Sequence, residues 1–235
     1  MPRSSWLNNL PHTPRESGLS VVLAFQVVMM FVLAPLASAG TLPPLVVDIC
    51  RLALAAAAVI LLARNRWVSI AITVTLVASV ALTISLRSGT AVSIVELERF
   101  AALTAFDVAI GWAVANVAFG AGKVSGHRIM GAVILYLSIA LVFANAYRVC
   151  ALLLHGSFSG LDMGQGHFAA NTLYFSLSTL TTTGFGDIAP LHPFVRSIAN
   201  LESVIGQLFP ATLLARLVSL QAASEVASGN TATKK

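Results

Sequence analysis

The sequence is poor in charged residues. Asp, Glu, Lys and Arg together make up 10% of its 235 residues, against roughly 25% in an ordinary soluble domain. Hydrophobic residues make up 57%, and the mean hydropathy is +0.86. This composition excludes a typical water-soluble enzyme, a disordered regulator and a nucleic-acid-binding protein. The net charge of +5 is better explained by basic loops that flank apolar helices in a lipid bilayer.

Features of other protein classes are missing as well. Two cysteines, Cys50 and Cys150, are too few for a disulfide framework, and both lie in apolar runs as free thiols. The sequence has no phosphate-binding glycine loop, and its five histidines are scattered rather than clustered with cysteines. No Ser-His-Asp or paired-carboxylate arrangement stands out. The sequence therefore predicts a protein that is not an enzyme and that needs no cofactor.

Six apolar stretches are long enough to cross a bilayer, which takes about 20 residues. A seventh stretch, 168–181, is too short to cross and ends in a Gly/Thr cluster, as a re-entrant helix does. We therefore predict an all-α membrane protein with six transmembrane helices and a re-entrant helix and loop between the fifth and the sixth. The predicted spans are 19–37, 45–63, 67–86, 100–119, 129–154 and 194–220.

The distribution of Lys and Arg predicts the orientation of the chain. If the N-terminus is cytoplasmic, nine of the fourteen basic residues fall in cytoplasmic segments, and six spans return the C-terminus to the same side. We expect a multi-pass protein of the plasma membrane, and the small size fits a prokaryotic inner membrane. Alternatively, the first span is a cleaved signal peptide, because it ends in Ala37-Ser38-Ala39, although its apolar run is longer than usual. The nine residues are Arg3, Arg15, Arg64, Arg66, Lys123, Arg128, Arg216, Lys234 and Lys235.

The short apolar stretch 168–181 leads into the motif Thr181-Thr182-Thr183-Gly184-Phe185-Gly186-Asp187. This motif lies between two predicted spans, on the outer side, and is the part of the sequence that most strongly indicates a function. A dehydrated cation needs a ring of oxygens, which backbone carbonyls supply when successive peptides point the same way. Glycine reaches the backbone angles that this requires at little cost, so Gly184 and Gly186 should resist substitution. The motif resembles the selectivity filter of potassium channels, which has the pattern Thr-x-Gly-aromatic-Gly-Asp.

The resemblance implies a filter over Thr182–Asp187 in which the carbonyls of Thr182, Thr183, Gly184 and Phe185 bind K⁺. The Thr182 hydroxyl would lie at the inner mouth, and Phe185 would point away from the ions and brace the filter. The pore helix at 168–181 would aim its partly negative C-terminal end at the cavity, which favours a cation there.

Three positions depart from the commonest family pattern. Thr183 stands where Val is commonest and Phe185 where Tyr is commonest, and both bear on the degree of selectivity. Ser178 is acidic in some family members and pairs there with the Asp that follows the filter. That pair cannot form here, so filter-based inactivation cannot be transferred to this chain.

The last span resembles the inner helix of such pore domains. Gly206 stands at the position of the gating hinge, and Pro210 kinks the helix one turn later. The alternative for Gly206 is close packing at a helix crossing. Ionisable residues inside a membrane face a cavity, a pore or a partner. Because Glu202 and Arg148 both lie about 10–12 Å deep, we predict an ion pair between them behind the filter; the rival hypothesis places Glu202 in the pore wall.

The first four spans match the voltage-gated channel plan only in number. A voltage sensor needs several Arg or Lys residues along its fourth span, but 100–119 has none, and its only charge is Asp107. We expect Asp107 to be paired with an Asn or Arg inside the bundle, and we predict weak or no intrinsic voltage dependence. The predicted divisions are a cytoplasmic segment (1–18), a four-span peripheral domain (19–128), a pore domain (129–220) and a short cytoplasmic tail (221–235).

The sequence thus predicts a homotetramer in the lipid bilayer that passes K⁺ passively, with no nucleic-acid partner. A separate chain would have to supply any ligand-gating domain. Two alternatives remain: a weakly selective monovalent cation channel, and a non-conducting pore-like membrane protein that acts with a partner.

Overall fold

The structure is a computed structural model that describes residues 14–42, 92–118, 126–164 and 167–232. Between 43 and 91 it describes four residues, all of them helical: Val46, Cys50, Ile70 and Val74. The predicted spans 45–63 and 67–86 otherwise lie outside the described residues. The described part is mostly helical, as the composition predicts.

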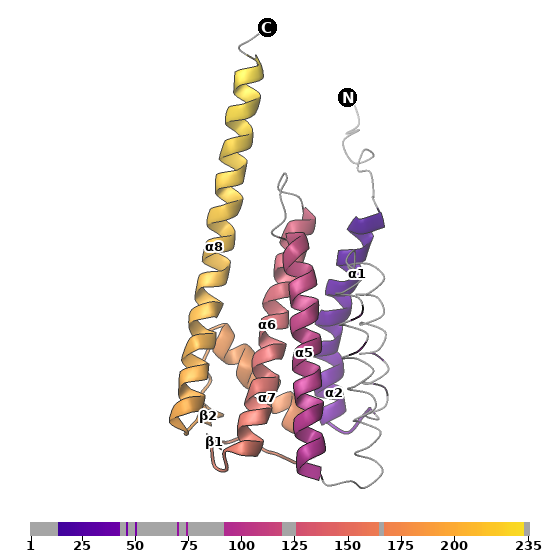
Figure 1. Ribbon diagram of the computed structural model, residues 1–235, viewed down its shortest axis with the longest axis vertical. Coiled ribbons are helices and arrows are strands. Elements are labelled where there is room, and N and C mark those ends of the chain that lie inside the picture. Colours follow the sequence, from indigo (N-terminus) through magenta and orange to yellow (C-terminus); the bar gives the residue numbers. More distant parts are fainter. Residues whose placement is uncertain are drawn as a thin grey trace, which may run out of the picture.

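The helices run side by side along one direction, and the short helix α7 crosses the space between α6 and α8 (Figure 1). The start of α1 and the end of α8 lie at the same end of the molecule (Figure 1). In chain order the elements are α1 (Pro14–Val28), the π-helix η2 (Met29–Leu33), α2 (Ala34–Ser38), α5 (Val92–Ala118), α6 (Gly126–Leu153), β1 (Phe158–Ser159), α7 (His167–Leu180), β2 (Ala189–Pro190) and α8 (Pro193–Ala232).

Three described helices are long and apolar enough to cross a membrane. They contain the segments Ser20–Ser38, Ile129–Leu153 and Pro193–Arg216, which correspond to the first, fifth and sixth predicted spans. The fourth predicted span lies in α5, whose strongly apolar part, Leu103–Trp112, is shorter. The chain is therefore a multi-pass membrane protein.

Two helix ends differ from the prediction. Helix α5 begins at Val92, so Glu96, Glu98 and Arg99 belong to a helix and not to a loop between the predicted spans 67–86 and 100–119. Helix α8 continues to Ala232 through most of the segment predicted as a polar tail. Residues 92–99 include Glu96, Leu97, Glu98 and Arg99, and residues 221–232 include four alanines, Gln221 and Glu225. Neither stretch contains proline, so residues of good helix propensity extend each helix beyond its apolar part.

The first predicted span is helical without a break from α1 to α2, and it contains the π-helical turn η2. Pro35 follows it at the start of α2. Proline cannot donate a backbone hydrogen bond, and its ring clashes with the carbonyl four residues earlier, so the helix widens in the turn before Pro35. The segment ends where the Thr41 hydroxyl donates to the Leu36 carbonyl at 2.6 Å and Gly40 takes a φ of +72°.

Helix α6 is the centre of the packing. Its fully buried alanines, Ala132, Ala140 and Ala144, let neighbouring helices approach closely, and such small residues are typical of helix contacts in membranes. On one side α6 packs against α1 and α5, and on the other against α7 and α8. A core cluster that spans α6 and α7 also includes η2: Met30, Leu137, Ala140, Ala144, Leu173 and Leu180.

Candidate ion-conducting site

Helix α7 spans His167–Leu180, one residue earlier at each end than the predicted 168–181. The loop that follows, 181–187, has an alternating backbone. Thr182, Gly184 and Gly186 have φ values of +56°, +61° and +83°, and Thr182 is the only non-glycine residue with a positive φ among the described residues. The two glycines thus adopt the angles for which the sequence analysis selected them. A β-branched residue in this region costs of order 1–3 kcal/mol, and no sequence signal marked Thr182 for it.

Three consecutive N–H groups of the loop are hydrogen bonded to one residue near the end of α7. The Ser178 carbonyl accepts from the N–H groups of Thr183 and Gly184 at 2.9 and 3.2 Å. The Ser178 hydroxyl accepts from the N–H of Phe185 at 3.3 Å. Ser178 therefore anchors the middle of the loop to the helix, partly through a carbonyl that the helix end leaves without an intrahelical partner.

These hydrogen bonds determine where the loop carbonyls point. In a planar trans peptide the N–H and the C=O point in opposite directions. The carbonyls of these three peptides therefore point away from α7, and they belong to Thr182, Thr183 and Gly184. These are three of the four carbonyls predicted to line an ion path, and all residues from Thr181 to Asp187 are exposed in the single chain.

The Asp187 end of the loop is held by Tyr174. The Tyr174 hydroxyl donates to Asp187 Oδ1 at 3.0 Å, and the Phe185 ring stacks on the Tyr174 ring with a centroid distance of 5.7 Å and an interplanar angle of 12°. Asp187 thus has a tyrosine partner in place of the acidic partner that Ser178 cannot provide. No role was predicted for Tyr174, although it lies four residues before Ser178 on the same helix.

A pair of two-residue strands lies next to the Asp187 end of the loop. Strand β1 pairs with β2 antiparallel, with Ser159 opposite Ala189. Gly160 follows with a φ of +73°, and a Cβ there would lie 1.9 Å from the Asp187 carbonyl oxygen. Gly160 therefore allows a close backbone approach, and no role was predicted for it.

Helix α8 contacts the Thr182 end of the loop and the end of α7. The Ser203 hydroxyl donates to the Thr179 carbonyl at 3.3 Å, and Gln207 Nε2 donates to Thr182 Oγ1 at 2.6 Å. Between them, Gly206 lies so close to α7 that a Cβ would be 1.8 Å from the Leu180 carbonyl oxygen. Close packing at a helix crossing therefore describes Gly206 in this structure, and its role as a hinge stays a prediction.

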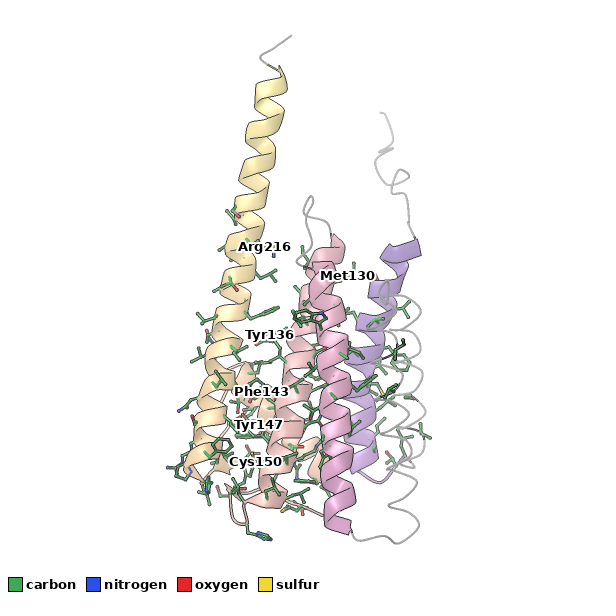
Figure 2. The ribbon with its side chains drawn as sticks, in the orientation of Figure 1. Met130, Tyr136, Phe143, Tyr147, Cys150 and Arg216 are labelled. Carbon is green, nitrogen blue, oxygen red and sulfur yellow. The ribbon has the colours of Figure 1, made fainter. Side chains whose placement is uncertain are left out.

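Pro210 lies inside α8, which is helical on both sides of it. Between α6 and α8, the side chains of Tyr136, Phe143 and Tyr147 follow one another along α6 (Figure 2). The Tyr136 ring lies 5.6 Å from that of Phe209 on α8, and its hydroxyl donates to the Leu180 carbonyl at 3.2 Å.

Glu202 is fully buried between α6, α7 and α8. The Tyr147 hydroxyl donates to Glu202 Oε2 at 2.6 Å, and Ser176 Oγ contacts Oε1. The same Ser176 Oγ lies 2.8 Å from the Ala140 carbonyl oxygen. The burial of Glu202 within one chain argues against the rival hypothesis that it lines a pore.

Arg148 has a different set of partners, so the predicted Arg148–Glu202 ion pair is not formed in the structure. Its Nε donates to Thr172 Oγ1 at 2.8 Å, and its Nη2 donates to the Ala169 carbonyl at 2.8 Å. Its Nη1 donates to Asn145 Oδ1 at 2.7 Å, and Asn145 Nδ2 donates to Asp107 Oδ2 at 2.8 Å. Asp107 is thus bonded to an Asn, which is one of the two partner types expected for it.

The part of the chain that contains this loop matches a known protein family. Residues 132–221 match the family described as Ion channel. Residues 132–221 are an ion channel domain. The domain contains most of α6, the whole of α7, the loop 181–187 and α8 as far as Gln221, and it overlaps the pore domain predicted at 129–220. Its family is one of ion channels and not of enzymes. No curated protein matches the sequence.

Proposed function

We propose that this protein is a homotetrameric, potassium-selective channel with a filter formed by Thr182–Asp187. The observation that carries the proposal is the direction of the loop peptides. Their N–H groups are bonded to Ser178, so the carbonyls of Thr182, Thr183 and Gly184 turn to the exposed side of the chain. One such row of oxygens cannot surround an ion, whereas four rows around a common axis can replace its hydration shell.

Helix α5, which packs against α6 of the channel domain, lacks the row of charges that a voltage sensor carries. Between Phe100 and Ala118, helix α5 carries a single charged residue, Asp107, whose carboxylate accepts a hydrogen bond from Asn145. Moving gating charge across the membrane requires several Arg or Lys residues on such a helix. We therefore propose weak or no intrinsic voltage dependence, and a steep conductance–voltage relation of the purified protein would contradict this.

A weakly selective monovalent cation channel is the second candidate. The hydroxyl of Thr183 lies 2.8 Å from that of Thr181, so a polar pair replaces the apolar side chain commonest at the Thr183 position. Altered support of the carbonyls there would lower the discrimination between K⁺ and Na⁺. The localisation of this protein in a prokaryotic plasma membrane with both termini cytoplasmic belongs to the same proposal.

The test is cation flux into liposomes that contain the purified protein, with K⁺ and Na⁺ gradients measured separately. The proposal predicts flux of K⁺ well above that of Na⁺, abolished by Gly184→Ala. The matched control is Gly156→Ala, because Gly156 has a similar φ of +70° and an equally open Cβ direction but lies in the turn after α6. Equal K⁺ and Na⁺ flux would favour the weakly selective channel. No flux in either gradient, from protein that remains tetrameric, would favour the non-conducting alternative.

A further inference from the structure

The side chain of Gln207 contacts the loop at the residue whose hydroxyl is predicted to lie at the inner mouth. Its Nε2 donates to Thr182 Oγ1 at 2.6 Å. Both side chains are exposed in the single chain, and they meet at the Thr182 end of the loop. The family resemblance assigned a role to Thr182 and Gly206 but none to Gln207.

The surrounding backbone fixes the position of Gln207. Gly206, its neighbour, packs onto the Leu180 carbonyl with no room for a side chain. One turn earlier, Ser203 donates to the Thr179 carbonyl. Two contacts on adjacent turns thus set both the height and the rotation of α8 against the end of α7. Gln207 reaches Thr182 from a helix that cannot slide or rotate without breaking them.

The hydrogen bond changes what the Thr182 hydroxyl can offer to an ion. A hydroxyl has one proton and two acceptor lone pairs, and its proton is free to rotate. With one lone pair occupied by Gln207, the remaining lone pair and the proton have defined directions. A dehydrated cation gains most from an oxygen that is already oriented, because no reorganisation is needed when the ion arrives.

We propose that Gln207 is a positioning residue that sets cation affinity and K⁺/Na⁺ discrimination at the innermost ion site by orienting the Thr182 hydroxyl. The inference rests on the proposed function, since it presumes that Thr182 faces the ion path. It deepens that function by placing one determinant of selectivity on the inner helix, outside the filter sequence.

The test uses the purified full-length protein in planar bilayers, with Ba²⁺ as the probe because it is a divalent cation close in radius to K⁺. Ba²⁺ is added to both sides, so that the orientation of the protein does not matter. Gln207→Leu removes the amide at similar size. We expect Ba²⁺ block to weaken about five-fold or more, the change that corresponds to one lost hydrogen bond, together with a lower K⁺/Na⁺ permeability ratio. Asn200→Leu, the same kind of change at an exposed position of α8, should leave both values unchanged.

A double-mutant cycle separates this role from a merely structural one. Thr182→Val removes the hydroxyl, so adding Gln207→Leu to it should cause no further loss of Ba²⁺ block. Additive effects would overturn the proposal, because independent residues contribute additively. Unchanged block and permeability ratio in Gln207→Leu would also overturn it.

If Gln207→Leu fails to form tetramers, Gln207→Asn replaces it in the cycle. It keeps the amide but is one methylene too short for the 2.6 Å contact. Failure of the proposed function looks different from failure of this inference. In the first case the wild-type protein itself shows no preference for K⁺, whereas in the second the wild type is selective and the Gln207 variants match it.

Discussion

Helix α7 is held by different kinds of contact on the side of α5 and α6 and on the side of α8. On the side of α5 and α6, Arg148 bonds to Thr172 and the Ala169 carbonyl and reaches Asp107 through Asn145. On the side of α8, the contacts are between neutral groups and one carboxyl, and Gly206 brings the backbones together. The first side depends on a buried charge that needs its partners, and the second on short distances and hydroxyl donors.

The difference teaches how each side should respond to substitution. A buried charge that loses its partner is costly, because the remaining charge stays in a medium of low polarity. A hydrogen-bonded carboxyl can be replaced by an amide of the same shape at little cost, because the acceptor and donor positions remain. Substitutions on each side, and one in the loop that follows α7, test this difference.

The largest effect is expected for Arg148→Met. Arg148 is 3% exposed, and its loss removes the donor of three hydrogen bonds, to Thr172, the Ala169 carbonyl and Asn145. We expect a loss of about 3 kcal/mol or more in stability, measured as a lower midpoint of thermal denaturation of the purified protein in detergent. Arg196→Met, at an exposed arginine of α8, is the control, and an equal loss there would refute the account of a buried network.

Gly206→Ala should come next, on the opposite side of α7. The new methyl group would meet the Leu180 carbonyl oxygen at 1.8 Å, so α8 or the end of α7 must move. Overpacking of this kind costs typically about 1–3 kcal/mol, and here it also displaces the loop that follows α7. We expect reduced stability and a loss of K⁺ flux. Gly111→Ala is the matched helical control, because its nearest contact would be an ordinary 3.5 Å. A fully active Gly206→Ala would contradict the packing role.

Substitutions of Glu202 should have a smaller effect than Gly206→Ala, and Glu202→Gln should be milder than Glu202→Ala. Glutamine can still accept from the Tyr147 hydroxyl and donate to Ser176 Oγ, so its flux and stability should stay close to wild type. Alanine leaves both partners without the carboxyl, at a cost of about 1–3 kcal/mol for buried polar groups. The midpoint of thermal denaturation and the K⁺ flux, measured for both variants, test this difference. If Gln is as damaging as Ala, the negative charge itself is required.

The smallest effect is expected for Tyr174→Phe, which removes the hydrogen bond to Asp187 but keeps the ring that stacks on Phe185. We expect a small loss of stability, because the hydrogen bond is exposed to solvent, and an unchanged K⁺/Na⁺ permeability ratio. Tyr174→Leu, which also removes the stack, should cost more. Equal stability of the two variants would mean that the stacked rings contribute nothing.

Sequence reasoning predicted the helix and the glycine backbone of the candidate site, because the signals for both are local. The length and apolar pattern of 168–181 predicted a helix that the structure has at His167–Leu180. The need for left-handed backbone predicted the role of Gly184 and Gly186, whose φ values are positive. Thr182 could not be found in the same way, because its strain is imposed by hydrogen bonds from a folded loop and not by its own side chain.

Partners across helices were harder to predict. Depth in the membrane led to a pairing of Arg148 with Glu202, but depth does not determine the direction in which a side chain leaves its helix. Successive residues of an α-helix point about 100° apart, so Tyr147 meets Glu202 while Arg148 turns to Thr172 and Asn145. The contact between Gln207 and Thr182 joins residues 25 positions apart and requires the packing of α8 against α7.

The most direct test of the central claim is the reversal potential of the purified protein in a planar bilayer, with K⁺ on one side and Na⁺ on the other. A filter of carbonyls at Thr182–Asp187 predicts a reversal potential displaced strongly in the direction set by K⁺, and no current from Gly184→Ala. A reversal potential near zero, or an unchanged current from Gly184→Ala, would contradict it.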